Sequence, residues 1–307
     1  MFQHVILTRF SCAFRHRTPQ GGWEIRPPDQ EWIAQRLDLF ERYCLRSIER
    51  QTCKAFIWVL LCHPTTPTDV LTRLTALVAG LNGVVLLFDG LPLGSGLART
   101  LDEQLSLGSQ PTITTRLDSD DALAPGFVET VQAIACATRE HPILISCPYG
   151  ILWDDASRRA YWAFGLGNPF LSLVTPSRAF DTVLAEASRK IKYRFPIAIG
   201  PRRSMFVQVV HGRNVLNRVH RLRYPMSARQ VRTCFPFLPF REARSSLLGT
   251  AAGRSLFYMR VFVRRFIRHV DIPLLEHYSL VRRCKPGQIL DLSGLRSGMN
   301  EGSTGRA

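Results

Sequence analysis

Three aspartates, Asp118, Asp120 and Asp121, directly follow an apolar, β-branched run over residues 112–117. If this run is a strand that continues through them, alternate side chains point the same way, so Asp118 and Asp120 share one side. Two carboxylates on one side can hold a hard divalent cation and leave positions open for water and phosphate oxygens. The alternative is a solvated turn in which Ser119, Asp120 and Asp121 cap the next helix. Spacing alone favours neither interpretation.

The elements around these aspartates alternate between strand and helix. Short apolar runs predict four buried parallel strands, at 5–10, 56–62, 84–88 and 111–117. Apolar residues recur at helical spacing over four segments, 29–51, 68–79, 97–107 and 127–139. Asp29 is the expected N-cap of the first helix. This alternation predicts an α/β fold with a mostly parallel sheet flanked by helices.

Polar residues follow each of the predicted strands. In open sheets of this kind, ligands bind beyond the carboxyl ends of the strands. Arg9, His63, Asp89 and the aspartates at 118–121 are expected to meet at that edge. This convergence favours the cation-and-phosphate interpretation over the solvated turn. The sequence contains neither Gly-x-Gly-x-x-Gly after the first strand nor Gly-x-x-x-x-Gly-Lys, so the common dinucleotide and P-loop motifs are missing.

Later segments are expected to complete the sheet and its edge. Residues 143–153 and 159–164 predict an antiparallel hairpin added to the sheet, with Asp154 and Asp155 in its turn. A strand over 205–210 then leads into His211.

Three further segments have weaker patterns. Residues 11–28 are rich in Arg, Gly and Pro and predict a loop. Residues 168–172 predict an apolar loop that closes over a substrate, and residues 180–187 a short helix.

Charge is distributed unevenly along the 307 residues. The net charge is +16, yet residues 1–188 hold 16 basic and 19 acidic side chains, whereas the remainder holds 24 basic and five acidic ones, a net of +19. Such a block attracts a polyanion, whether nucleic acid, an anionic membrane or a phosphorylated substrate. We expect a globular domain over 1–220, a basic, partly helical extension over 221–292 and a disordered tail over 293–307.

Within the extension, residues 255–270 predict a helix with apolar residues on one side and Arg260, Arg264 and Arg268 on another. One expectation is peripheral contact with an anionic membrane surface. The other is that the helix packs on the domain and its arginines face water.

Composition also bears on the compartment. The eight cysteines include no Cys-x-x-Cys pair and most lie in apolar runs, which predicts buried thiols in a reducing environment. The longest apolar runs fall short of a membrane span, and the first is too short for a signal peptide. The sequence therefore favours a cytoplasmic protein, at most peripheral at the inner membrane.

Four sequence blocks resemble those of the rhamnosyltransferase family. They are Leu-Thr-Arg-Phe at 7–10, Leu-Phe-Glu-Arg-Tyr-Cys-Leu at 39–45, Thr-Arg-Leu-Asp-Ser-Asp-Asp-Ala-Leu at 115–123 and Gln-Val-Val-His-Gly-Arg-Asn-Val at 208–215. The resemblance implies a single glycosyltransferase-A-like catalytic domain that uses a nucleotide-diphospho-sugar donor.

The resemblance also implies a metal site and a donor site. Asp118 and Asp120 match the Asp-x-Asp motif that holds Mg²⁺ or Mn²⁺ against the diphosphate, and His211 matches a histidine near the same ion. The expected donor-binding residues are Arg9, Asp89, Arg116, Asp118, Asp120 and Asn214. The implied donor is dTDP-L-rhamnose and the implied acceptor a glycan or lipid-linked glycan, as in polysaccharide biosynthesis.

Two residues depart from the family pattern. The acidic residue that usually ends the second strand is His63 here, which makes Asp89 the better candidate to face the nucleobase or ribose. The aromatic residue before Gln-Val-Val-His is Phe206 instead of Trp.

The sequence leaves other points open. An inverting transfer needs a base for the acceptor hydroxyl, and the candidates are Asp121, Asp154, Asp181 and Glu186. The same fold could use a different sugar. A non-enzymatic nucleic-acid-binding protein is the rival from another class, because the basic segment interleaves arginines with aromatics. No helix-turn-helix or zinc-finger spacing supports nucleic acid as a partner.

Overall fold

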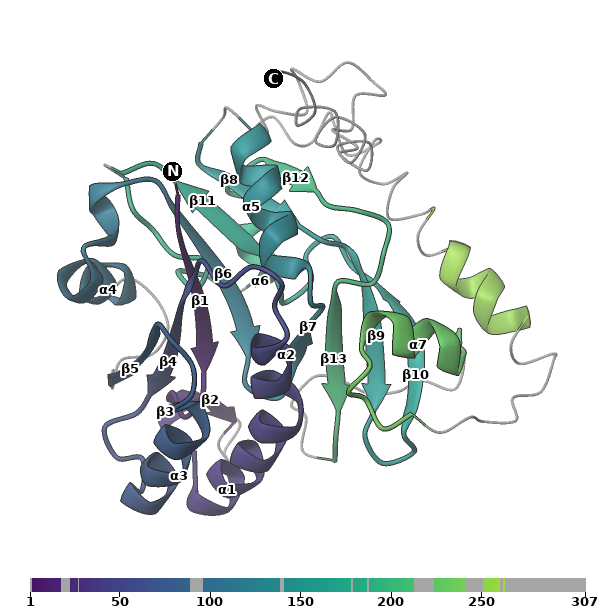
Figure 1. The fold of residues 1–307 in the computed structure, drawn as a ribbon, viewed down its shortest axis with the longest axis horizontal. Helices are drawn as coiled ribbons and strands as arrows, with labels where there is room; N and C mark the ends of the chain where they lie inside the picture. Colours follow the sequence, from purple (N-terminus) through teal and green to yellow (C-terminus); the bar gives the residue numbers. More distant parts are fainter. Residues whose placement is uncertain are drawn as a thin grey trace, which may run out of the picture.

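The computed structural model describes residues 2–17, 23–26, 28–88, 96–138, 141–177, 179–186, 188–212, 224–240, 251–259 and 262. Within them a seven-stranded central sheet has the order β12-β8-β11-β6-β1-β4-β5 (Figure 1). Its strands are β1 (Gln3–Arg9), β4 (Ile57–Cys62), β5 (Val84–Phe88), β6 (Thr112–Asp118), β8 (Ile143–Ser146), β11 (Ser172–Thr175) and β12 (Ile197–Ile199). Only β11 runs antiparallel to its neighbours. The predicted α/β fold with a mostly parallel sheet is confirmed.

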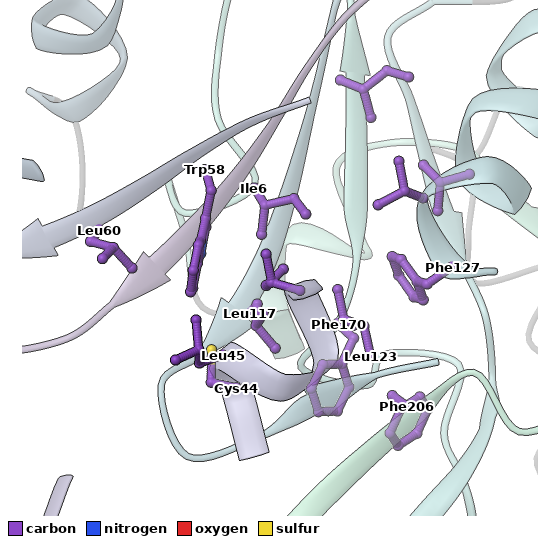
Figure 2. Close-up of a cluster of buried hydrophobic side chains, with 14 of the residues drawn as sticks. Ile6, Cys44, Leu45, Trp58, Leu60, Leu117, Leu123, Phe127, Phe170 and Phe206 are labelled. Carbon is purple, nitrogen blue, oxygen red and sulfur yellow. The ribbon is translucent and has the colours of Figure 1, made fainter. Parts of the chain in front are cut away.

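Helices cover both faces of the central sheet. They are α1 (Gln30–Leu39), α2 (Arg46–Glu49), α3 (Thr68–Val78), α4 (Leu97–Leu105) and α5 (Phe127–Ala137). On one face, α1, α3 and α5 pack on a core that includes Ile6, Trp58 and Leu117 (Figure 2). On the other, α4 packs on Val5 and Leu7. Odd and even residues of β1 therefore point into different cores, as alternation along a strand requires.

The long helix predicted over residues 29–51 is confirmed in outline. Asp29 is its N-cap and accepts a hydrogen bond from the Trp32 backbone N–H at 2.8 Å. Between α1 and α2 the chain forms a π-helical stretch, Phe40–Leu45, which the spacing of apolar residues did not indicate. Such wider turns are rare and are often found at functional sites.

A second sheet of four strands stands beside the first, in the order β10-β9-β13-β7. Its strands are β7 (Ala122–Leu123), β9 (Tyr149–Asp154), β10 (Arg159–Phe164) and β13 (Phe206–Val210). The predicted hairpin exists as β9 and β10, but it is not added to the central sheet. The predicted strand over 143–153 breaks between β8 and β9, so that only β8 joins the central sheet. The residues after the break bury Ile151 and Trp153 in a separate core with Val207 and Val209.

Three weaker predictions are wrong. Within 11–28, strands β2 (Phe14–Arg17) and β3 (Trp23–Arg26) pair as a hairpin instead of forming only a loop. The 168–172 segment is buried rather than free to close over a substrate, with Asn168 hydrogen-bonded to the Cys147 and Gly165 carbonyls.

Over residues 180–186, turns and irregular backbone replace the helix predicted over 180–187, and α6 (Ser188–Ile191) comes later in the chain. Asp181 accepts from the Thr182 backbone N–H at 2.8 Å, and the Thr182 hydroxyl accepts from the Leu184 N–H at 3.3 Å. Side chains that bond nearby backbone in this way compete with helix formation.

The described part of the basic C-terminal region contains two helices. Helix α7 (Ala228–Cys234) was not predicted; it begins with a capping box between Ser227 and Gln230 and packs Val231 on the second sheet. The helix predicted over 255–270 is helical over 251–259 and at 262, and its other positions lie outside the described residues. Among described helices, none combines the length and apolarity needed to cross a bilayer.

Candidate active site

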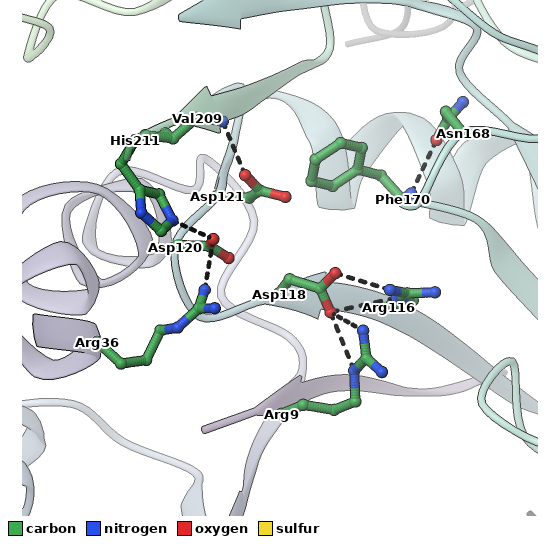
Figure 3. A network of polar contacts seen from close by, with 10 residues as sticks. All are labelled: Arg9, Arg36, Arg116, Asp118, Asp120, Asp121, Asn168, Phe170, Val209 and His211. Carbon is green, nitrogen blue, oxygen red and sulfur yellow. Dashed lines mark hydrogen bonds and ion pairs between the residues drawn. The ribbon is translucent and has the colours of Figure 1, made fainter. Parts of the chain in front are cut away.

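Asp118 ends β6 at the carboxyl edge of the central sheet, where its register partner is Arg9 at the end of β1. Its Oδ1 accepts from Arg9 Nη2 at 2.7 Å, and its Oδ2 accepts from Arg116 Nη2 at 2.7 Å. Figure 3 shows both guanidinium groups directed at this one carboxyl. The structure thus brings Arg9, Arg116 and Asp118 together on one face, because residues two apart on a strand share a side.

The opposite charges in this group stabilise the ionised forms of Asp118 and Arg9. Burial alone would raise the pKa of Asp118, but the charges and hydrogen bonds of Arg116 and Arg9 outweigh it and hold the pKa well below its usual range. Burial would lower the pKa of Arg9, and Asp118 more than offsets this. One carboxylate between two guanidiniums leaves a surplus positive charge, and the Arg9 side chain is 28% exposed. The edge can therefore attract an anion.

Asp120 points to a different set of partners. Strand β6 stops at Asp118, and the chain turns so that the Asp121 N–H donates to the Asp118 carbonyl at 3.0 Å. Asp120 forms an ion pair with Arg36 of α1, and its Oδ2 lies 3.0 Å from His211 Nε2 (Figure 3). The prediction that Asp118 and Asp120 share one side of a continuing strand is wrong, because the strand ends between them.

Asp121 anchors the second sheet to this turn. Its Oδ1 accepts from the Val209 backbone N–H at 2.8 Å, two residues before His211. Burial raises the pKa of Asp121 well above its usual range, and the neighbouring charges of Asp120 and Asp118 raise it further. Burial and these charges therefore make Asp121 harder to ionise than an exposed aspartate.

The solvated-turn alternative is wrong. Ser119, Asp120 and Asp121 are only 1%, 6% and 3% exposed. The following helix, α5, has Gly126 as its N-cap and no side-chain capping bond. Asp120 and Asp121 are thus held inside the molecule at the junction of the seven-stranded and four-stranded sheets.

His211 follows β13 on the far side of this junction. Beside it, the Asp155 N–H donates to the Val210 carbonyl at 3.0 Å. The Asp155 carboxyl accepts from the Tyr43 hydroxyl and from Arg42 Nη1, the latter at 3.0 Å. Burial would raise the pKa of Asp155, but these hydrogen bonds and the charges of Arg42 and His211 lower it. Tyr43 lies in the π-helical stretch, so that stretch contacts the second sheet next to His211.

Comparison with protein families gives one decisive match. The family described as "Putative rhamnosyl transferase" matches residues 3–222. The chain belongs to this family. Among curated proteins, no relative matches it.

Solved structures that resemble this member of the family include two of residues 1–349 of TarS from S. aureus. TarS 1–349 has a TM-score of 0.41 and 11% sequence identity, over 68% of this chain and 60% of that one. TarS 1–349 in complex with UDP-GlcNAc has a TM-score of 0.42 and 10% identity, over 72% and 63% of the two chains. The family member thus spans less than two thirds of the length of TarS 1–349.

The remaining predicted site residues of this family member lie elsewhere. Asp154 accepts from the Ser157 hydroxyl at 2.6 Å within the β9–β10 turn. Glu186 lies 3.1 Å from Arg194, and Asp181 lies 3.8 Å from the same side chain. Of the four candidate bases, Asp121 is the one that the structure places beside Asp118 and Asp120.

Two residues expected at the sheet edge, His63 and Asp89, and the expected donor-binding residue Asn214 remain to be placed. His63 follows β4 and bonds Thr65 through Nδ1 at 2.7 Å. Asp89 and Asn214 lie outside the described residues.

The residues at the turn fit a divalent cation in part. Among described residues, no group of three His, Cys, Asp or Glu side chains is placed to hold a metal ion. Both oxygens of Asp118 already accept from guanidinium groups. Asp120 and His211 nevertheless offer one carboxylate and one imidazole 3.0 Å apart. A cation such as Mg²⁺ or Mn²⁺ that keeps water and phosphate ligands needs few protein ligands.

Sequence reasoning missed Arg36. Its guanidinium lies 4.3 Å from the ring centroid of Trp32 and pairs with Asp120. Trp32 and Arg36 are four residues apart, which brings them together on one helix face. The sequence shows this spacing, but it does not show that this face of the helix is turned toward Asp120.

Proposed function

We propose that this protein is a glycosyltransferase that moves a sugar from a nucleotide-diphosphate donor to a glycan or lipid-linked acceptor. L-rhamnose is the proposed sugar and dTDP-L-rhamnose the proposed donor, in keeping with membership of the family. The observation that supports the proposal most directly is the Arg9–Asp118–Arg116 group at the carboxyl edge of the central sheet. This edge is where open α/β sheets bind their ligands.

Breaking the bond between sugar and diphosphate leaves negative charge on the leaving group, and catalysis requires that this charge be stabilised. Arg9 and Arg116 are held by Asp118 in one orientation on one face. Because the guanidiniums are already positioned, little side-chain freedom is lost when they bind phosphate oxygens. Asp118 in this proposal orients the arginines.

The cofactor in this proposal is Mg²⁺ or Mn²⁺, which when bound supplies further positive charge to the diphosphate. Asp120 and His211 would hold it, and Asp118 is the neighbouring carboxylate of the motif. Asp121 contributes by holding Val209, and through it the end of β13, at the position that brings His211 to Asp120.

The proposal is tested by titrating dTDP-L-rhamnose and a panel of UDP-sugars into the full chain by calorimetry, with and without Mn²⁺. We expect dTDP-L-rhamnose to bind in a Mn²⁺-dependent way. Arg116→Gln is expected to weaken donor binding roughly 10- to 100-fold, the loss of a charge-assisted hydrogen bond. Asp120→Asn is expected to remove the dependence on Mn²⁺ and to abolish sugar transfer.

Matched controls are Arg99→Gln and Asp38→Asn, whose side chains are 83% and 58% exposed. These should bind like the wild type. Absence of binding by every nucleotide sugar would overturn the proposed function, and tight binding of a different sugar nucleotide would overturn only the choice of rhamnose.

A further inference from the structure

The helix over 251–259 with residue 262 presents an apolar stripe to solvent. Of the large hydrophobic side chains that are exposed among described residues, three of five fall within this short segment: Tyr258 at 55%, Met259 at 54% and Phe262 at 67%. At 100° per residue, Tyr258, Phe262 and Met259 cover adjacent positions on one side of the helix. Arg254 precedes Tyr258 by one turn and lies over its ring at 5.9 Å.

The opposite side of the same helix fixes it to the protein. Gly253 is buried, and Leu256 and Phe257 are partly buried. The Phe257 ring lies 6.3 Å from Trp162 of β10 and 5.9 Å from Tyr224. The helix lies beside the second sheet at the edge of the molecule (Figure 1). The Tyr258 ring also lies 6.3 Å from Tyr224, yet more than half of Tyr258, Met259 and Phe262 remains exposed outside this packed side.

The charge of the surrounding sequence indicates which kind of partner suits this apolar stripe. The sequence from Ala243 to Val270 contains six arginines and no acidic residue. A second copy of this chain would bring two such basic segments together, and like charges repel. An anionic surface is favoured instead. A lipid bilayer suits the stripe better than nucleic acid, because Met259 and Phe262 need an apolar medium, whereas a phosphate backbone offers mainly charge.

We infer that Tyr258, Met259 and Phe262, flanked by Arg254, form a docking surface for the anionic lipid bilayer. The apolar side chains enter the boundary between head groups and acyl chains, while arginines attract the lipid phosphates. This inference is independent of the donor site, so the two can fail separately.

Co-sedimentation of the full chain with vesicles tests it. One set of vesicles contains phosphatidylcholine alone and the other three parts phosphatidylcholine to one part phosphatidylglycerol. We expect binding to the anionic vesicles, weakened by high salt. A variant that combines Tyr258→Ser, Met259→Ser and Phe262→Ser should bind them about tenfold less or weaker still.

The matched control combines Phe88→Ser and Tyr193→Ser, which are 48% and 56% exposed elsewhere on the surface, and it should bind like the wild type. Thermal unfolding and donor binding in solution verify that the triple variant is folded. Equal binding of the triple variant and the wild type would overturn the inference, as would equal binding to neutral and anionic vesicles. Binding to a single-stranded oligonucleotide but not to vesicles, or a dimer that only the triple variant loses, would overturn it in favour of those partners.

Discussion

Asp118 and Asp120 are two residues apart, yet each is matched to its own pair of cationic or basic side chains. Asp118 contacts Arg9 and Arg116, and Asp120 contacts Arg36 and His211. Opposite charge offsets the free-energy cost of burying a carboxylate. Asp121 is placed differently, since it accepts a backbone N–H and lies beside both other carboxylates.

Replacing Asp121 with Asn removes an acid that is costly to ionise and keeps an oxygen for the Val209 N–H. The folded state has the higher pKa, so between the two pKa values it binds the proton that the unfolded chain has released. The stability that this proton contributes is lost as pH rises through the folded pKa. Asp121→Asn is therefore expected to gain stability over the wild type as pH increases above about 4.

Urea unfolding at successive pH values measures this difference, with the exposed Asp38→Asn as control. A difference between Asp121→Asn and the wild type that stays constant from acid to neutral pH would contradict a raised pKa for Asp121.

The aspartates themselves could be found from the sequence, because three carboxylates directly after a β-branched run form a local pattern. The side chains that contact these aspartates could not be found from the sequence. Arg36 and Tyr43 reach the site from a helix whose rotation is set by packing of Ile33, Leu37 and Phe40 against the central sheet. The sequence also did not indicate that the strand ends at Asp118. The alternation of side chains was therefore wrongly extended to Asp120.

Strand β13 packs closely against its neighbour β9. It carries Phe206 at one end and precedes His211 at the other. A Cβ added at Gly150 on the neighbouring β9 would lie 2.4 Å from the Phe206 ring. That ring stacks on Phe170 with centroids 4.4 Å apart, so it cannot move aside freely.

Gly150→Ala is therefore expected to lower the free energy of unfolding by about 1–3 kcal/mol, the usual cost of overpacking a core. It should also weaken donor binding, because β13 must shift and His211 with it. Gly80→Ala is the control, since a Cβ there meets nothing within 4 Å. Chemical denaturation compares the two, and equal stability of Gly150→Ala and Gly80→Ala would contradict the contact with Phe206.

Elements of the central sheet were predictable where a strand is buried on both faces, because such strands form continuous apolar runs. Strands β1, β4 and β6 are of this kind. The edge strand β5 is less buried, but its five residues are all apolar. The short strands β11 and β12 were missed because four or three residues give too little pattern. The break between β8 and β9 was missed because both halves are apolar, and only packing assigns them to different sheets.

Across the whole molecule, buried polar side chains connect strands and helices through hydrogen bonds, in addition to the packing of apolar side chains. His4 in β1 is 2% exposed, and its Nε2 lies 2.8 Å from Thr115 Oγ1 in β6. Its Nδ1 lies 3.3 Å from Gln132 Nε2 in α5. Burial lowers the pKa of His4 to about 3.

This histidine is expected to make the folded protein sensitive to acid. Below about pH 6.5 the His4 imidazole is protonated in the unfolded chain, whereas in the folded chain it stays neutral down to about pH 3. The free energy of unfolding therefore falls as pH decreases across that window. At pH 5 the expected loss is about 2 kcal/mol. His4→Gln should flatten the dependence of urea unfolding on pH, and an unchanged slope would contradict burial of a neutral imidazole.

The pairing of β7 with β13 limits how this sequence can change over time. Ala122 pairs with Val207, and His211 lies four residues further on. A strand advances about 3.3 Å per residue with alternating side chains. Inserting or deleting one residue within 208–210 would shift the imidazole by about that distance and turn it to the opposite side. We therefore expect natural variants to exchange side chains in this stretch and to keep its length.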